Sequence, residues 1–167
     1  MRRTAGALLV FFLTAGGCGY TLKSTPPHGI KTISVETFQN ETLNEPTLEI
    51  DLTNQVIHRF NFDGTLRVAR EENADAVLKG KLTQLIREPL RYTSAEEISE
   101  YRLVLKVDLS LWDRRTQTLI WEEKNFVGDT TFSTTGPRAK SEEKALGDAM
   151  GELSRRIVDR VVEEWPE

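Results

Sequence analysis

The sequence has little of what an enzyme or a disulfide-stabilised fold depends on. Its 167 residues include one cysteine and two histidines, so no internal disulfide can form and histidine ligands for a metal are scarce. No motif of a catalytic nucleophile, a zinc protease or a phosphate-binding loop is present. We therefore expect a non-enzymatic protein without a metal site or a bound cofactor, whose hydrophobic core alone stabilises the fold.

Positive charge is also in short supply, because 22 Lys and Arg residues are outnumbered by 26 Asp and Glu residues, and the formal net charge is -4. An acidic domain is a poor general binder of the phosphate backbone, so no nucleic-acid partner is expected. No apolar run reaches the roughly 20 residues that a membrane-spanning helix needs.

The only cysteine lies directly after an export signal. Arg2 and Arg3 form a positive start, residues 7–15 form a short apolar run, and small residues precede Cys18. This arrangement resembles the cleavage site of bacterial lipoproteins, where the cysteine thiol is acylated and becomes the new N-terminus. We therefore expect a signal peptide over residues 1–17 and fatty acyl chains, such as palmitate, on Cys18. Two or more acyl chains give stable membrane anchoring. The alternative is a signal cut elsewhere, which leaves a free thiol.

The remaining chain divides into a tether over residues 18–29, marked by Pro26-Pro27, and a single domain over residues 30–167. Apolar residues alternate along five segments and recur at helical spacing along two. The predicted strands are 30–38, 65–69, 75–87, 100–112 and 118–127, and the predicted helices are 46–61 and 140–164. Polar loops are expected over 39–45, 88–99 and 128–138.

Helices and strands mix without strict alternation, which favours an α+β fold. Strand 100–112 places Leu and Val on one face and charged residues on the other, so it needs cover on one side only. The two amphipathic helices supply this cover. We predict a two-layer sandwich with a mixed sheet of four or five strands and a polar opposite face. In strand 118–127 we place Trp121 on one face and Phe126 on the other.

Basic residues near the predicted loops are candidates for anion binding. Arg87 and Arg91 flank Pro89 between two long strands, and Arg138 and Lys140 lie at the start of the last helix. The fork of a guanidinium fits phosphate or carboxylate. Ordinary surface charge is the alternative for any one of them.

The chain resembles the LptE family, also called rare lipoprotein B. The resemblance depends on short segments in a given order: Cys18-Gly19-Tyr20-Thr21-Leu22, Pro46-Thr47-Leu48-Glu49, Ala74 to Gly80, Glu100-Tyr101-Arg102-Leu103, and a closing helix that runs to Trp165.

This resemblance implies an outer-membrane lipoprotein on the periplasmic side, which plugs the LptD-type β-barrel, assists its assembly and supports lipopolysaccharide insertion into the outer leaflet. It also implies lipopolysaccharide contact through basic loop residues, with Arg91 and Lys140 as the nearest matches and Arg87 and Arg138 almost as close. The alternatives are a periplasmic ligand-binding or envelope-scaffold lipoprotein without a barrel partner, and a hydrolase of envelope polymer.

Overall fold

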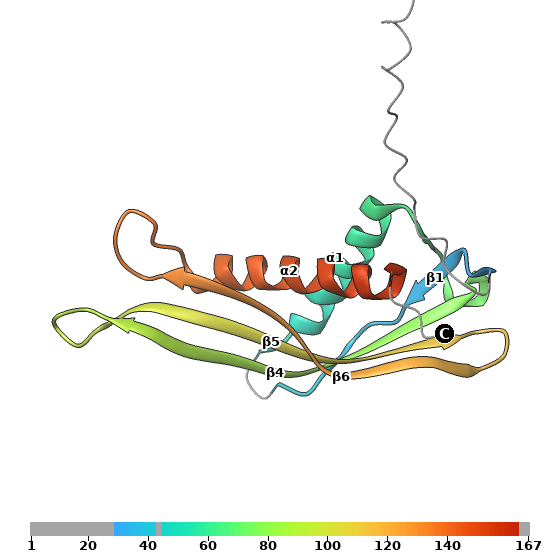
Figure 1. Ribbon diagram of the computed structural model, residues 1–167, viewed down its shortest axis with the longest axis horizontal. Coiled ribbons are helices and arrows are strands. Elements are labelled where there is room, and N and C mark those ends of the chain that lie inside the picture. The colour runs from blue at the N-terminus through green and yellow to red at the C-terminus, as the bar shows by residue number, and fades with distance from the viewer. Residues whose placement is uncertain (1–28, 43–44, 164–167) are drawn as a thin grey trace, which may run out of the picture.

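The computed structural model describes residues 29–42 and 45–163. It has two layers, with both helices on one face of a six-stranded mixed sheet (Figure 1). The α+β prediction is therefore confirmed. The strands are β1 (Thr32–Val35), β2 (Gln39–Asn40), β3 (Arg67–Val68), β4 (Ala76–Tyr92), β5 (Ile98–Asp113) and β6 (Thr118–Ser133), and the helices are α1 (Leu48–Asp63), η2 (Glu71–Asn73) and α2 (Glu142–Glu163). Cys18 lies outside the described residues.

Three long antiparallel strands make up most of the sheet, in the order β4, β5, β6, and β1 joins β4 in parallel on the other side. The alternation of β5 places its core side chains as predicted. Leu103, Leu105, Leu109 and Leu111 are all buried. This face packs against the helices, whereas Arg102 and its alternate neighbours lie on the uncovered face.

The predicted strand count of four or five is too low, because β2 adds a sixth strand. Gln39 and Asn40 pair in parallel with Lys81 and Leu82 of β4, and the Glu41 N–H donates to the Leu82 carbonyl at 2.9 Å. Two residues are too few to show a strand period. The segment was therefore predicted as a loop.

The long strands extend further than predicted. β6 runs through Gly128 to Ser133, where a loop was expected, because these residues pair with Glu100–Leu105 of β5. Gly128 permits a close approach of α2, since a Cβ on it would lie 2.4 Å from the Leu153 Cβ. β4 and β5 also lengthen into the predicted loop 88–99, so that only residues 93–97 turn between them.

The placement of Trp121 and Phe126 on opposite faces is wrong, because both side chains are buried in the same core beneath α2. The cause is a bulge at Asn125, whose φ is 55° and whose N–H donates to the Asp108 carboxylate at 2.9 Å. One extra residue in a strand reverses its alternation.

The helices pack through the stripes that their spacing predicts. Leu52, Val56 and Phe60 of α1 are completely buried, as are Leu153 and Ile157 of α2. α1 ends at Gly64, whose N–H donates to the Phe60 carbonyl at 3.0 Å. Its φ of 72° is a left-handed conformation that favours glycine. None of the described helices is long and apolar enough to cross a membrane.

Two arginines attach α2 to the edge strand β6. The Arg156 guanidinium lies 5.4 Å from the Phe126 ring centre and donates to the Val127 carbonyl. The Arg160 guanidinium lies 4.5 Å from the Trp121 ring centre and bonds Glu123 at 2.8 Å. These cation–π contacts attach one part of α2, around Arg156 and Arg160, to residues 121–127 of β6.

Candidate functional site

The two ends of the sheet carry different polar groups. We call the end where the described chain begins, with the β5–β6 turn, the proximal end, and the end with the β4–β5 turn and the β6–α2 loop the distal end (Figure 1). The four basic residues predicted to bind an anion all lie in the distal half. They differ in their ion pairs and in their exposure to solvent, and these two properties decide which of them can bind an external anion.

Strand register places three of the four basic residues around one row across the distal end. Arg91 pairs with Glu100, Glu100 pairs with Ser133, and Ser133 bridges to Ala139, which lies between Arg138 and Lys140. Neighbouring strands are about 4.8 Å apart, so this row spans about 14 Å. The structure thus brings together the end of β4 and the loop before α2, which are about 50 residues apart in the sequence.

Arg87 is occupied by two carboxylates. Its guanidinium pairs with Glu45, which lies just before α1, and its Nε bonds Glu142, the first residue of α2, at 2.5 Å. The Glu45 carboxylate, followed by that of Glu142, raises the pKa of Arg87. Its charge is more than compensated within the protein. Arg87 therefore ties β4 to the starts of both helices, and it has the least capacity of the four for an external anion.

The other three basic residues are more accessible. The Arg91 side chain is 76% exposed and lies 3.6 Å from Glu100, which is a long ion pair. Lys140 bonds Asp148 at 2.7 Å on the helix surface. Arg138 is exposed and has no ion pair with any of the described residues. Their charges can be redirected to a ligand at small cost, because exposed ion pairs contribute little free energy.

Exposed apolar side chains accompany these cations, a feature that the sequence prediction missed. Leu90 and Tyr92 are 51% and 58% exposed, and Tyr101 stacks on Phe132 with ring centres 5.7 Å apart. The prediction treated residues 88–99 as a polar connection. Leu90 and Tyr92 within this segment were the signal in the sequence that could have indicated an exposed apolar surface. The distal end therefore combines positive charge with apolar surface.

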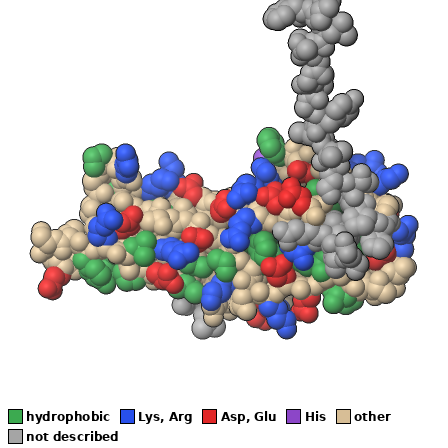
Figure 2. Space-filling view, viewed as in Figure 1, with side chains coloured by type: hydrophobic (Ala, Val, Ile, Leu, Met, Phe, Trp, Pro, Cys, Tyr) green, Lys and Arg blue, Asp and Glu red, His purple; other side chains and the backbone are tan. Residues whose placement is uncertain are grey.

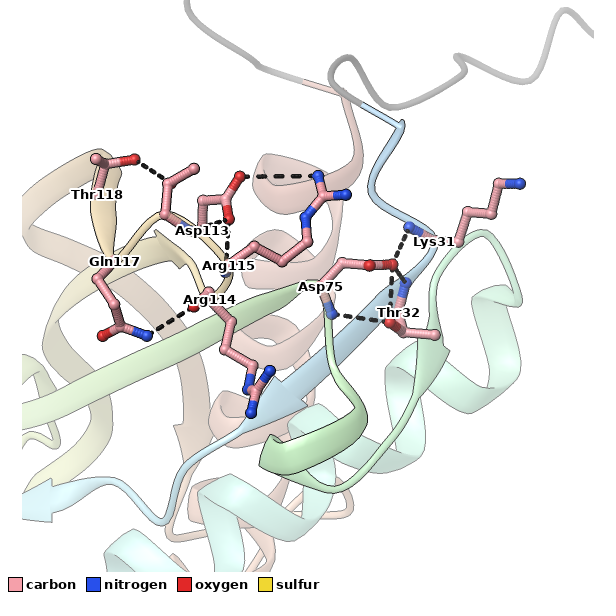
Figure 3. A network of polar contacts seen from close by, with 9 residues as sticks. Lys31, Thr32, Asp75, Asp113, Arg114, Arg115, Gln117 and Thr118 are labelled. Atoms are coloured by element: carbon pink, nitrogen blue, oxygen red, sulfur yellow. Dashed lines mark hydrogen bonds and ion pairs between the residues drawn. The ribbon is translucent and has the colours of Figure 1, made fainter.

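The proximal end is organised around Asp75. Its carboxylate accepts bonds from the Lys31 N–H at 2.9 Å, the Thr32 N–H at 3.0 Å and the Thr32 hydroxyl at 2.9 Å (Figure 3). The Asp75 carbonyl accepts from the Arg114 N–H at 2.9 Å. The donor N–H of Lys31, followed by the Thr32 hydroxyl, lowers the pKa of Asp75. One residue thus joins β1, β4 and the β5–β6 turn.

The β5–β6 turn uses a second carboxylate in the same way. Asp113 accepts from the backbone N–H groups of Arg115 at 2.8 Å and Thr116 at 3.1 Å. The Thr116 N–H is the main cause of the lowered pKa of Asp113. Residues 114–117 form a tight turn between the two strands, and the Asp113 carboxylate at its start is bound mainly by backbone.

The uncovered face of the sheet between the two ends is polar and largely ion-paired. The pairs are Lys79–Glu36 at 3.0 Å, Lys81–Glu41 at 3.1 Å, Arg102–Asp129 at 3.1 Å and Lys124–Glu122 at 3.9 Å. Figure 2 shows the same mixture of signs along the side of the molecule. No group of three or more potential metal ligands occurs among the described residues.

Comparison with known proteins assigns the family. The family model LptE, described as lipopolysaccharide-assembly, matches residues 30–161. The chain belongs to the LptE family. The match covers both helices up to residue 161 and every strand, so the resemblance seen in the sequence is confirmed. No curated protein matches the LptE-family chain in a sequence search.

Solved structures share the fold at low identity. The hypothetical protein CT253 from Chlamydia trachomatis is 14% identical, with a TM-score of 0.55 over 79% of this chain and 95% of its own. A minor lipoprotein from Acinetobacter baumannii is 16% identical, with a TM-score of 0.53 over 80% and 93%. An uncharacterized lipoprotein B from Nitrosomonas europaea is 15% identical, with a TM-score of 0.50 over 80% and 83%. At these identities the likeness concerns the fold alone.

Proposed function

We propose that this LptE-family protein is a non-enzymatic outer-membrane lipoprotein, anchored through Cys18 on the periplasmic side, that plugs an LptD-type β-barrel and supports lipopolysaccharide insertion. The family match over residues 30–161 carries the proposal. A plug must bury its own core and present polar surface, because the interior of a large barrel is polar. The ion-paired, uncovered sheet face fits this requirement.

The distal end is the proposed contact for lipopolysaccharide. This lipid carries phosphate groups beside acyl chains, so a binding surface needs cations next to apolar side chains. Arg91, Arg138 and Lys140 supply the cations, and Leu90 and Tyr92 supply the exposed apolar surface. Guanidinium groups suit phosphate oxygens because the fork can bind two of them. Arg87 contributes to this end by holding the starts of the helices.

Charge reversal tests the distal contact. Arg91→Asp and Lys140→Asp are each expected to weaken binding of purified lipopolysaccharide about ten-fold, which corresponds to about 1.4 kcal/mol. Both side chains are largely exposed, so urea unfolding should change little. Lys124→Asp is the control, since Lys124 is exposed on β6 nine residues before Ser133 of the row. Unchanged binding in both distal variants would remove these residues from the site.

Association with the barrel needs a separate measurement. Crosslinking in the intact envelope, followed by purification through the acylated protein expressed from its native locus, is expected to recover a β-barrel of far greater mass. Recovery of the protein alone would favour the alternative of a lipoprotein without a barrel partner. Mass spectrometry of the purified chain should show acyl groups on a mature N-terminal Cys18.

A further inference from the structure

Beyond β2, one edge of β4 has no neighbouring strand among the described residues. β2 pairs only with Lys81 and Leu82 of β4, whereas β4 continues to Tyr92 at the distal end of the sheet (Figure 1). β5 pairs with the opposite side of β4 along this stretch. A strand edge without a partner presents a row of free backbone N–H and C=O groups, so the distal half of β4 has one paired side and one open side.

The hydrogen bonds beside β2 fix the direction of the backbone groups along this edge. The Leu82 carbonyl accepts from the Glu41 N–H at 2.9 Å, so the polar backbone groups of Leu82 point away from β5. In an antiparallel ladder this direction alternates from residue to residue. The register shifts between Leu82 and Gln84, so Thr83 and Gln84 together oppose one residue of β5. After this bulge the outward direction therefore falls on the odd-numbered residues.

Leu85, Arg87 and Pro89 are the residues whose backbone groups point outwards. Pro89 agrees with this assignment, because proline lacks an N–H and is found in edge strands with that position facing solvent. The open edge thus offers the N–H groups of Leu85 and Arg87 and the carbonyls of all these residues. No hydrogen bond joins any of these groups to another part of the chain that the structure describes.

The distal part of the other long edge, on β6, is occupied. The Arg156 guanidinium of α2 donates to the Val127 carbonyl, and the Lys140 N–H, just before α2, donates to the Ser133 carbonyl at 2.9 Å. α2 and the segment before it thus bind the edge of β6. No helix or strand within the described ranges binds the edge of β4 beyond β2 in this way, which leaves that edge open to another molecule.

A hollow of about 480 Å³ lies beside the open edge. It is lined by residues 83–87 of β4 and, from the connection between β2 and α1, by Glu41, Thr42 and Glu45. Its charged groups are already paired, because Glu41 lies 3.1 Å from Lys81 and Glu45 pairs with Arg87. An occupant of the hollow is therefore recognised by backbone hydrogen bonds and by contact with the leucine and isoleucine among the lining residues.

We propose that the open edge of β4 accepts an extended segment of the barrel partner as an added strand. The inference rests on the proposed function, since it names the part of the domain with which the barrel protein pairs. Alternate N–H and C=O groups along a strand edge are complementary to the backbone of another extended chain, and edge strands recognise peptides in this way. The added strand lies beside residues 85–89 and continues the line of β2.

The shortness of the open edge indicates an occupant that other contacts already hold nearby. The bulge at Thr83 and the proline at position 89 end the regular edge on both sides, and bulges and prolines oppose edge-to-edge pairing between free copies of a chain. A few backbone hydrogen bonds give weak binding between free molecules. A segment of a partner that already surrounds the domain acts at high effective concentration, so the same few bonds can hold it.

Residue-resolved amide hydrogen exchange tests the added strand on the full acylated chain. In the chain alone, the amides of Leu85 and Arg87 should exchange quickly because they face solvent, and those of Ile86 and Glu88 slowly because they bond β5. In the complex that is purified from the envelope with the barrel, exchange at Leu85 and Arg87 should slow about ten-fold or more. Unchanged exchange rates at both residues in that complex would overturn the proposal.

Proline at position 87 removes one outward N–H group and leaves the ladder with β5 intact. Arg87→Pro and Arg87→Ala both lose the ion pairs with Glu45 and Glu142, so they differ mainly in that N–H group. In the complex, the Leu85 amide should exchange about five-fold faster in Arg87→Pro than in Arg87→Ala. Slow exchange at Ile86 in both variants checks that the sheet is intact. Equal exchange at Leu85 in the two variants would contradict a bond to the Arg87 N–H.

The same purification separates this inference from the proposed function. Recovery of the barrel with fast exchange at Leu85 and Arg87 would refute the added strand and leave the plug standing. Recovery of the chain without a barrel would refute the plug and, with it, the barrel as the occupant of the edge. Slow exchange at both amides in the purified chain alone, becoming faster on dilution, would show that a second copy occupies the edge and would also overturn the proposal.

Discussion

At the proximal end of the sheet, carboxylates are bound mainly by backbone N–H groups, whereas at the distal end they are bound by the side chains of arginine and lysine. Asp75 alone accepts three hydrogen bonds from Lys31 and Thr32. Arg87, in contrast, is shared by Glu45 and Glu142. Arg87 is therefore less available to an external anion than the exposed Arg91, and the number of basic residues at an end does not determine this availability.

α2 packs closely on β6 at Gly128, and this contact helps to hold the helix along the sheet between its two ends. A substitution at Gly128 tests how much the close approach contributes to stability. Gly128→Val places side-chain atoms where Leu153 already lies, so the helix must move. We expect a loss of about 3 kcal/mol in the free energy of unfolding, measured in urea. Gly147→Ala is the control, because a Cβ there meets open space and alanine favours a helix by about 1 kcal/mol. Equal stability of the two variants would show that the close approach is unimportant.

Removing the proximal carboxylate should have the next largest effect. Asp75→Ala leaves the Lys31 and Thr32 N–H groups without their acceptor, and it leaves the buried Thr32 hydroxyl only the Asn73 carbonyl at 3.4 Å. Hydrogen bonds to a charged group contribute more than neutral ones, so we expect a loss of about 2–3 kcal/mol in urea unfolding. If Asp75→Ala lowers the free energy of unfolding by no more than Arg87→Ala does, then backbone-bound carboxylates stabilise the fold no more than side-chain-bound ones, contrary to this prediction.

Acid should destabilise the proximal end selectively. The folded pKa values of Asp75 and Asp113 lie below the ordinary value of 3.8. Their contribution to stability is thus fully present above that value and is lost as the pH falls through the folded pKa values. Unfolding measured from about pH 5 down to about pH 1 should show this decline in the wild type and a smaller one in Asp75→Asn. If the free energy of unfolding falls equally with pH in the wild type and in Asp75→Asn, then the Asp75 carboxylate does not cause the decline.

Loss of the distal clamp, by which we mean the ion pairs of Arg87 with Glu45 and Glu142, should give the smallest effect on stability. Arg87→Ala breaks two ion pairs whose side chains are partly exposed, so the expected loss is about 1 kcal/mol or less in urea unfolding. Lys144→Ala, which breaks no ion pair with any residue that the structure describes, should lose almost nothing. A loss above about 2 kcal/mol for Arg87→Ala would mean that the clamp behaves like a buried pair.

The sequence predicted those features that depend on local periodicity. The buried face of β5 follows from strict alternation between Leu103 and Leu111, and the stripes of both helices follow from their spacing. The four distal cations were also found, because basic residues beside Pro89 and before α2 are visible in the sequence. The sequence did not predict that Arg87 is occupied by two carboxylates while Arg91, Arg138 and Lys140 stay accessible.

Non-local contacts account for what the prediction missed. β6 extends to Ser133 because β5 offers it pairing partners, and Asn125 bulges because Asp108 of the neighbouring strand binds its N–H. β2 exists because Leu82 presents a carbonyl to its edge. None of these partners is adjacent in the chain, so no local pattern records them.

The sequence alone thus determined the fold class, the buried faces of β5 and of both helices, and the positions of the charges along the chain, since burial of apolar side chains at a fixed period leaves few alternatives. The tertiary structure decided which charges remain free. Glu142 meets Arg87 across 55 residues and Asp129 meets Arg102 across 27. Electrostatic compensation depends on distance in space, and only the folded chain sets that distance.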